Sequence, residues 1–252
     1  MQPCNVTVDD RDQVYVVDTG NSRIKKLTAN LDFFDHITNE GLEGRSSTGI
    51  CMGSSKDSLL VINWRTKTVT EMTLDGNTIG SFTHDDFKEP IDIALDLDDN
   101  VVIADNGIGS VLVFETSGKL LKTIGSRGNG RGQFKDISAV TVAPSGDILV
   151  ADSRIQVFNS NGDFVREIYP QGKGKGRYGG LVCDKHGFLL ATRTEKAKSF
   201  IQVFRLETGS LYSLIDSHGC KMKRPTGLAV MQDRHLVVVD IGNDCVRKYR
   251  YF

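Results

Sequence analysis

Five-residue stretches that are apolar apart from a polar last residue recur along the chain. They cover residues 14–18, 59–63, 101–105, 148–152, 188–192 and 236–240, and they end at Asp18, Asn63, Asp105, Asp152, Thr192 and Asp240. These last residues are spaced by 40 to 48 residues. Four strands of a propeller blade need about that length of chain. The pattern therefore predicts an all-β fold, a six-bladed β-propeller with four antiparallel strands per blade.

Each repeat has the same internal order of apolar and polar segments. A short first strand, such as 91–95, precedes a polar turn and then the apolar stretch described above. That second strand does not alternate, because a strand packed between two blades is covered on both faces. A third strand, such as 155–158, is followed by a glycine-containing turn and an outer strand, such as 120–124 in the preceding repeat.

The repeat divides one domain, residues 1–252, into six blades. Their predicted bounds are roughly 1–47, 48–89, 90–136, 137–177, 178–224 and 225–252. The last segment is too short for an outer strand. We therefore expect either that upstream residues of a longer polypeptide complete the sixth blade or that this blade has three strands.

The polar residue that ends each second strand has a predicted structural role. An aspartate there can accept hydrogen bonds from the backbone of the next turn and fix the loop that leads to the third strand. Asn63 and Thr192 can do the same less well. We interpret all six residues as structural and not catalytic.

Composition limits the function classes. The formal net charge is −1, so affinity for nucleic acid requires an uneven distribution of charge. No apolar stretch approaches the roughly 18 residues of a membrane span, and the first residues do not resemble a signal peptide. Five cysteines lie far apart without a CxxC pair, which favours reduced thiols in a cytosolic protein over a zinc site.

The predicted loops differ in charge between the two faces of the propeller. We call top face the one that carries the loops between second and third strands and the connections between blades. The bottom-face loops are acidic, as in 96–99, whereas the top-face connections 127–134, 171–178 and 220–224 are basic. Cationic loops are often merely solvated. Three successive connections of this kind nevertheless indicate a basic sector over blades three to six.

Cations beside aromatic rings on one face are typical of single-stranded nucleic-acid binding. The candidate RNA-binding residues are Arg23, Trp64, Arg65, Lys67, Arg127, Arg131, Phe134, Arg154, Lys173, Lys175, Arg177, Tyr178, Arg193, Lys221, Lys223 and Arg224. In this hypothesis the cations neutralise phosphates, and Trp64, Phe134 and Tyr178 offer stacking planes.

Residues 17–24 (VDTGNSRI) resemble the NHL repeat, and the resemblance extends over the whole chain, although repeats two and five lack the aspartate. The chain is thus similar to the NHL propellers of the TRIM-NHL family, regulators of messenger RNA. The resemblance implies binding of single-stranded, often U-rich RNA on the top face and translational repression. It also implies mRNA-repression or microRNA effector proteins as partners, no membrane partner, and a location in the cytoplasm, including ribonucleoprotein granules.

Two other function classes are open. The propeller could be a protein–protein interaction scaffold without nucleic-acid binding. It could also resemble metal-dependent lyase or hydrolase propellers, and His36, His84 and His218 fall in predicted top-face loops without a metal-ligand spacing. We predict no catalytic residue, no metal and no cofactor, and therefore no enzyme. RING cysteines are absent, although the full-length protein could be a ubiquitin ligase.

Overall fold

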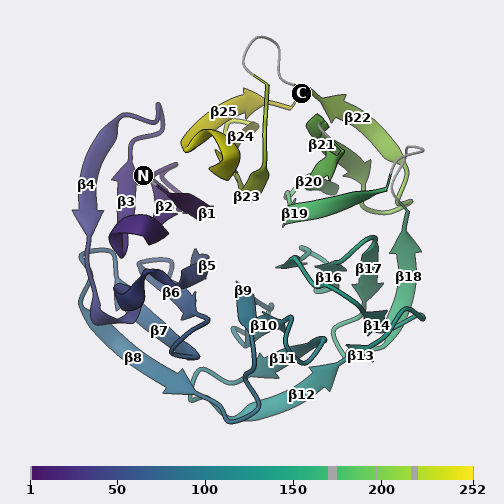
Figure 1. Cartoon of the computed structure of the whole chain (residues 1–252), viewed down its shortest axis with the longest axis horizontal. Helices are drawn as coiled ribbons and strands as arrows, with labels where there is room; N and C mark the ends of the chain where they lie inside the picture. The colour runs from purple at the N-terminus through teal and green to yellow at the C-terminus, as the bar shows by residue number, and fades with distance from the viewer. Residues whose placement is uncertain (1, 170–174, 197, 217–220, 252) are drawn as a thin grey trace.

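Six antiparallel sheets stand like blades around a central axis in the computed structural model (Figure 1), which describes residues 2–169, 175–196, 198–216 and 221–251. In the described chain, five sheets have four strands and the sixth has three. The six-bladed propeller is therefore confirmed, with the shortened last blade that the sequence indicates. Within these residues, no helix is long and apolar enough to span a membrane.

The strands follow one another from the axis outward in every blade. Blades one to three comprise β1 (Pro3–Val8), β2 (Val14–Asp18), β3 (Arg23–Leu27), β4 (Phe33–Ile37), β5 (Ser47–Met52), β6 (Ser58–Asn63), β7 (Thr68–Thr73), β8 (Thr78–Thr83), β9 (Pro90–Leu95), β10 (Val101–Asp105), β11 (Ser110–Phe114) and β12 (Leu120–Ile124). Blades four to six comprise β15 (Ala139–Val142), β16 (Ile148–Ala151), β17 (Ile155–Phe158), β18 (Phe164–Ile168), β19 (Gly176–Cys183), β20 (Phe188–Glu195), β21 (Lys198–Arg205), β22 (Leu211–Ile215), β23 (Pro225–Val230), β24 (His235–Asp240) and β25 (Cys245–Arg250). Two predicted blade boundaries, after residues 47 and 177, fall just inside β5 and β19.

The second strands form the core of the ring. Every residue of β2, β6, β10 and β16 is buried, because each strand is covered by the blades on both sides. This burial explains why the apolar stretches do not alternate with polar residues.

The inner strands crowd the axis and leave no room for side chains at some positions. A Cβ atom added at Gly180 of β19 would collide with the backbone oxygen of Thr226 in β23. One added at Gly49 of β5 would lie 2.9 Å from the Cα of Asp92 in β9. The glycines therefore let neighbouring inner strands approach closely.

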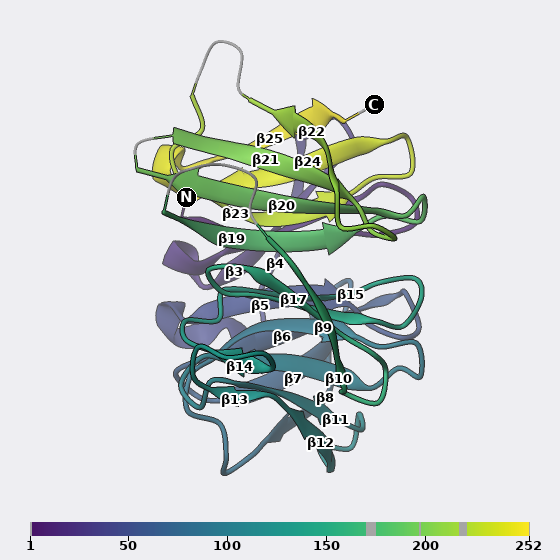
Figure 2. The same ribbon diagram turned by 90° about the vertical axis from the view of Figure 1, so that its right-hand side faces the viewer.

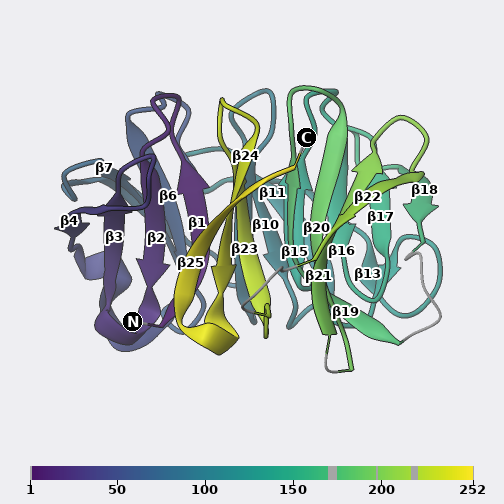
Figure 3. The same cartoon turned by 90° about the horizontal axis from the view of Figure 1, so that it is seen from above.

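Short elements outside the blades lie on the top face. They are the 3₁₀ turns η1 (Thr19–Asn21), η2 (Glu40–Arg45) and η3 (Ile241–Asn243), and the parallel pair β13 (Ser126–Arg127) and β14 (Gln133–Phe134). The top face lies on the left in Figure 2 and at the bottom of Figure 3. The two kinds of loops lie on the opposite faces to which the repeat assigns them.

Several of the polar residues that end the second strands make the predicted hydrogen bonds to the turn that follows them. Some of them also accept hydrogen bonds from the connection that precedes their own blade. Asp105 accepts from the backbone N–H of Ile108 in the next turn, at 3.2 Å. It also accepts from the backbone N–H groups of Lys88 and Glu89, at 2.8 and 2.9 Å, in the connection that leads to the inner strand of its own blade. Asp240 binds the backbone of Lys223 and Arg224 in the same way. In these two blades the carboxylate thus also fastens the connection from the preceding blade.

The described cysteines, Cys4, Cys51, Cys183 and Cys245, are free thiols, and Cys220 lies outside the described residues. Burial raises the pKa of the Cys4 thiol to about 12 and raises that of Cys183 as well. These thiols therefore stay protonated at neutral pH.

Candidate nucleic-acid interface

A groove on the top face lies where blades four, five and six meet. Its volume is about 640 Å³, and we call it the basic groove. Its walls come from the start of β19, from the β20–β21 hairpin and from the start of β23. The residues that line it are Ser138, Lys175, Gly176, Arg177, Tyr178, Gly179, Thr194, Lys196, Arg224, Pro225 and Thr226.

The long strands of blade five build the wall of this groove. β19, β20 and β21 have eight residues each, whereas β16 and β17 in blade four have four. The sequence indicates a lengthened loop in this repeat. The structure shows instead that the extra residues continue the hairpin, with Glu195 paired to Lys198 at its tip. Lys196 and Lys198 are therefore carried on a strand extension at the top face.

Four cationic side chains line the basic groove, on Lys175, Arg177, Lys196 and Arg224, and all four are exposed. Among the described residues, none of these side chains makes a hydrogen bond or an ion pair, and no carboxylate belongs to the lining. The predicted Lys173 lies outside the described residues. An unpaired cluster of this kind attracts a polyanion, because nothing in its wall compensates the charge.

The side chains of Tyr178 and Arg193 are buried even though Tyr178 borders the groove, which corrects the prediction that they contact RNA. Each is only 2% exposed. The Arg193 guanidinium lies over the Tyr178 ring, 4.9 Å from its centroid, and its Nε pairs with Glu195 at 2.6 Å. The Tyr178 hydroxyl donates to Gln202 at 3.0 Å, and burial raises the pKa of Tyr178 to about 12. The extended hairpin covers both side chains, so they form the support of the groove wall.

Phe134 is also buried, and its predicted stacking role is wrong. Its ring packs 5.6 Å from the ring of Phe158, in the core between blades three and four. The residue lies in β14, whose short pairing with β13 turns the aromatic side chain inward.

Three predicted cations hold the protein's own backbone or carboxylates. Arg127 donates to the carbonyls of Asn106, Gly107 and Lys135, at 2.5 to 3.1 Å. The Arg23 Nε pairs with Asp18 at 3.2 Å. Arg154 pairs with Glu167 at 3.1 Å and donates to carbonyls of the glycine-rich loop 128–133. The carboxylate partners of Arg23 and Arg154 correct the prediction that these two arginines bind RNA phosphates. Arg127 is exposed, and its hydrogen bonds reach only neutral carbonyl groups, so its predicted role stays a prediction.

Arg154 is instead a positioning residue for loop 128–133, which carries the exposed Arg131. We expect Arg154→Met to increase hydrogen exchange at the amides of Gly132 and Gln133 about tenfold or more, because the variant loses three hydrogen bonds to the loop carbonyls. Mass spectrometry of exchanged peptides measures the effect. Unchanged exchange in this loop would show that Arg154 does not order it.

The other predicted residues that the structure describes are exposed, except the half-buried Lys67, but they do not all gather at the groove. Lys221 and Lys223 lie just before β23, next to the groove residue Arg224. Trp64, 39% exposed, stacks with Arg65 at 5.5 Å and lies with Lys67 on blade two, across the ring from blade five (Figure 1). The structure therefore brings together part of the predicted set and separates the Trp64 cluster from it.

Two residues of this region are not among the predicted RNA-binding residues, although the sequence already places Lys196 among the top-face cations of blade five. Lys196 lines the basic groove, and Tyr169, at the top end of β18, is 64% exposed. The signal for Tyr169 was its position: it directly follows Ile168, the last apolar residue of an outer strand, and therefore falls in a top-face connection. Tyr169 is an exposed ring on blade four, in contrast to Phe134 and Tyr178.

Part of the acidity of the bottom face is structural. Asp9 accepts from the backbone N–H groups of Arg11 and Gln13, and Asp96 accepts from those of Asp98 and Asn100. These carboxylates each close a turn between a first and a second strand. The acidic turns of the bottom face thus follow from the repeat, whereas the basic sector of the top face comes from the connections between blades.

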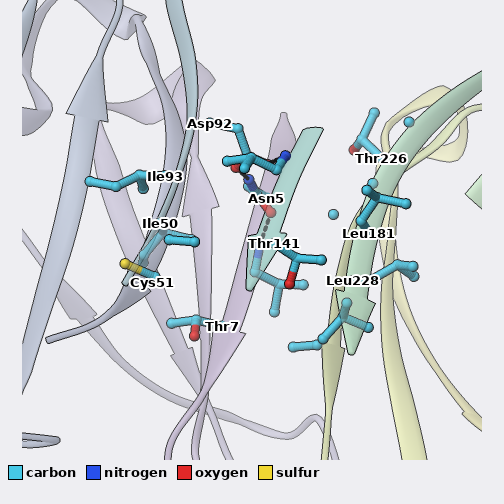
Figure 4. A pocket seen from close by; sticks show the side chains of 18 of the residues that line it. Asn5, Thr7, Ile50, Cys51, Asp92, Ile93, Thr141, Leu181, Thr226 and Leu228 are labelled. Carbon is cyan, nitrogen blue, oxygen red and sulfur yellow. Dashed lines mark hydrogen bonds between the residues drawn. The ribbon is translucent and has the colours of Figure 1, made fainter. Parts of the chain in front are cut away.

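A central cavity of about 410 Å³ runs between the inner strands. Figure 4 shows Asp92 of β9 directed toward Asn5 of β1, whose Nδ2 donates to Oδ1 of Asp92 at 3.0 Å. The backbone N–H of Val140 in β15 donates to Oδ2 at 3.0 Å. Burial raises the pKa of Asp92 to about 6, although these hydrogen bonds oppose the rise. One carboxylate therefore connects three blades at the axis.

The histidines do not converge on this cavity. His36 lies in β4, His84 follows β8, His186 lies between β19 and β20, and His235 begins β24; none of these four lines the cavity, and His218 lies outside the described residues. Within the described residues, no group of three His, Cys, Asp or Glu side chains could hold a metal ion.

Comparison with known proteins places the fold among solved propellers. No protein-family model and no curated protein matches the chain. A streptogramin B lyase structure is 16% identical, with a TM-score of 0.69, over 96% of this chain and 77% of the lyase. A catalytically inactive histidine-to-alanine variant of virginiamycin B lyase from Staphylococcus aureus with quinupristin is 13% identical, with a TM-score of 0.70, over 98% and 79%. A selenomethionine form of that lyase is 14% identical, with a TM-score of 0.66, over 96% and 78%. At these identities the likeness shows the fold alone.

The comparison corrects the prediction that this chain is not an enzyme. The prediction relied on the absence of recognisable catalytic motifs, yet the three solved propellers named above, which match nearly the whole chain, are lyases. The architecture therefore accommodates catalysis, and missing motifs do not exclude an enzyme on it.

Proposed function

We propose that the basic groove binds single-stranded RNA and that the chain is an NHL-type domain of a TRIM-NHL-like regulator, acting in the cytoplasm in the repression of messenger RNA. The observation that carries the proposal is the set of four exposed groove cations without a paired carboxylate among the described residues. The NHL-like motif at residues 17–24 supports the choice of RNA, with U-rich sequences as the first candidates.

The groove chemistry is suited to the backbone of a single strand. Lysine and arginine side chains that neutralise phosphates release condensed counterions, so binding weakens as salt rises. Lys175, Arg177 and Lys196 belong to blade five and Arg224 to the start of blade six, so a strand in the groove meets cations from two blades. The exposed ring of Tyr169 offers a stacking plane on the adjacent blade. In this proposal, mRNA-repression or microRNA effector proteins are the protein partners.

Removing the groove charges tests this function. We expect the variant Lys175→Ala/Arg177→Ala/Lys196→Ala/Arg224→Ala to raise the Kd for a fluorescent U-rich oligonucleotide at least about tenfold in 0.1 M salt. The slope of log K against log salt should fall by about 3 if all four side chains neutralise phosphates, because each contact on a single strand contributes about 0.7. Fluorescence anisotropy at several salt concentrations measures both quantities.

A bottom-face variant is the matched control. Arg11→Ala/Lys56→Ala/Lys185→Ala/Arg250→Ala removes four exposed cations and changes the net charge equally. Lys56 and Lys196 also share a left-handed backbone, with φ of 58° and 52°, so the backbone cost is matched. The control should retain most of the affinity. Equal losses in both variants would show that only the net charge matters, and affinity that ignores salt would contradict RNA binding at this groove.

A further inference from the structure

The wall of the central cavity is mostly aliphatic. The cavity volume of about 410 Å³ lies within the range of roughly 300 to 1,000 Å³ that is typical of small-molecule pockets. Every blade contributes at least one aliphatic side chain to the wall. Leu181 of β19 and Leu228 of β23 lie across the cavity from Asp92 of β9 (Figure 4). The cavity therefore has the size and the apolar lining of a ligand pocket.

Asp92 provides the carboxylate of this wall. Among the described residues that line the cavity there is no lysine, arginine or histidine, and the other ionisable groups are the thiols of Cys4, Cys51 and Cys183. Burial raises the pKa values of these thiols, so they stay neutral. These lining residues therefore contain no cation that could compensate the charge of Asp92.

The hydrogen-bond partners of the Asp92 carboxylate orient it without neutralising it. The Asn5 side chain and the backbone N–H of Val140 are uncharged donors, each at 3.0 Å. Asp92 and Asn5 are only half-buried, whereas every residue of the adjacent strand β10 is buried, because the inner strands border the cavity. A charge in so apolar a wall is costly until a cation pairs with it.

The composition of the wall indicates the kind of cation. A divalent metal ion needs several oxygen ligands, and within the described residues no group of three His, Cys, Asp or Glu side chains could hold one. A hydrated inorganic ion would gain nothing from the aliphatic side chains. A primary ammonium group has three N–H donors for a carboxylate. An attached aliphatic chain would bury apolar surface against the rest of the wall.

We propose that the central cavity binds a small organic cation, a primary ammonium group on a short aliphatic chain. The ammonium group pairs with Asp92 beside Asn5, and the aliphatic chain packs against Leu181 and Leu228. Binding removes the unpaired charge from the axis and thereby stabilises the folded ring. The four cations of the basic groove do not line the cavity, so the proposal does not depend on RNA binding.

Butylammonium is a suitable probe, and 1-butanol is its uncharged counterpart. We expect calorimetry at about pH 7.5 to give a Kd for butylammonium of about 1 mM or lower. On the wild type, 1-butanol should bind at least about tenfold more weakly, because it lacks the charge. Asp92→Asn keeps the size of the side chain and should weaken butylammonium binding at least about tenfold. Asp98→Asn, at an exposed turn, removes the same charge from the bottom face and should bind the probe as the wild type does.

The pH dependence of binding separates pairing with Asp92 from adsorption elsewhere. Butylammonium should bind about tenfold more weakly at pH 5 than at pH 7.5, because protonation of Asp92, with a pKa of about 6, competes with the ligand. Asp92→Asn should lose this dependence. No saturable binding, equal binding of 1-butanol, or wild-type affinity in Asp92→Asn would each overturn the proposal. Displacement of butylammonium by an equal concentration of potassium ions would overturn it in favour of an inorganic cation.

Discussion

Asp105→Ala is expected to lower the free energy of unfolding by about 3 kcal/mol. The carboxylate is fully buried and accepts from three backbone N–H groups, on Lys88, Glu89 and Ile108, at 2.8 to 3.2 Å. Alanine leaves these donors without their acceptor, at a cost of about 1 kcal/mol each. Because two of the donors lie in the connection from blade two, the change loosens the attachment of blade three to its neighbour.

Urea denaturation and thermal unfolding measure this effect, and a fall in Tm of about 10 °C is expected for a chain of this size. Asp105→Asn should lose about half as much, because it keeps one acceptor oxygen, as Asn63 does in blade two. Asp98→Ala, at an exposed turn, is the matched control and should change stability by less than about 0.5 kcal/mol. If Asp105→Ala were no worse than this control, the buried carboxylate would not fasten the connection.

The fold was predictable because its signal is repeated six times. Each second strand must be apolar on both faces, so even repeats two and five, which lack the aspartate, keep the spacing. The role of Asp105 was only half predictable. The turn that follows it is local, but Lys88 and Glu89 lie 17 and 16 residues earlier, and only the three-dimensional structure brings them to the carboxylate.

The candidate site was less predictable than the fold, since burial at a loop depends on tertiary contacts. Phe134 and Tyr169 both occur in top-face connections, but β14 directs the first into the core and leaves the second exposed. Likewise, Arg193 and Arg177 are both cations of blade five. The extended hairpin buries one and exposes the other. Sequence gives the face on which a residue lies, whereas the hydrogen-bonded partners of the arginines decide which charges are available to a ligand.

The second large expected effect is a loss of stability with rising pH that depends on Asp92. Burial at the axis raises its pKa in the folded protein from 3.8 to about 6. The folded state therefore holds the proton more tightly than the unfolded state. The stabilising contribution of the protonated form is complete below about pH 4 and disappears as the pH rises through about 6. A shift of two pKa units corresponds to about 3 kcal/mol.

Other groups at the axis do not titrate in this range. The nearest ionisable neighbours are the thiols of Cys4 and Cys51, whose pKa values burial raises and the charge of Asp92 raises further. They stay protonated between pH 4 and 7.5. Elsewhere, hydrogen bonds to Asp18 and Asp233 lower their pKa values. Their contribution to the stability of the protein is therefore lost as the pH falls, which is opposite to the effect of Asp92. The effect of Asp92 must therefore be measured as a difference between variants.

Asp92→Asn removes the titration but keeps the size of the side chain. We expect the stability of the wild type, relative to this variant, to fall by about 3 kcal/mol between pH 4 and pH 7.5, with the steepest change near pH 5. The difference in stability between wild type and variant at any single pH also reflects altered hydrogen bonds to Asn5 and Val140. The change of this difference with pH is therefore the decisive quantity. Urea unfolding in a series of buffers measures it, and Asp98→Asn, at an exposed turn, should run parallel to the wild type. Parallel curves for Asp92→Asn as well would mean that the carboxylate is charged at the axis without cost, and that water in the cavity solvates it as bulk solvent would.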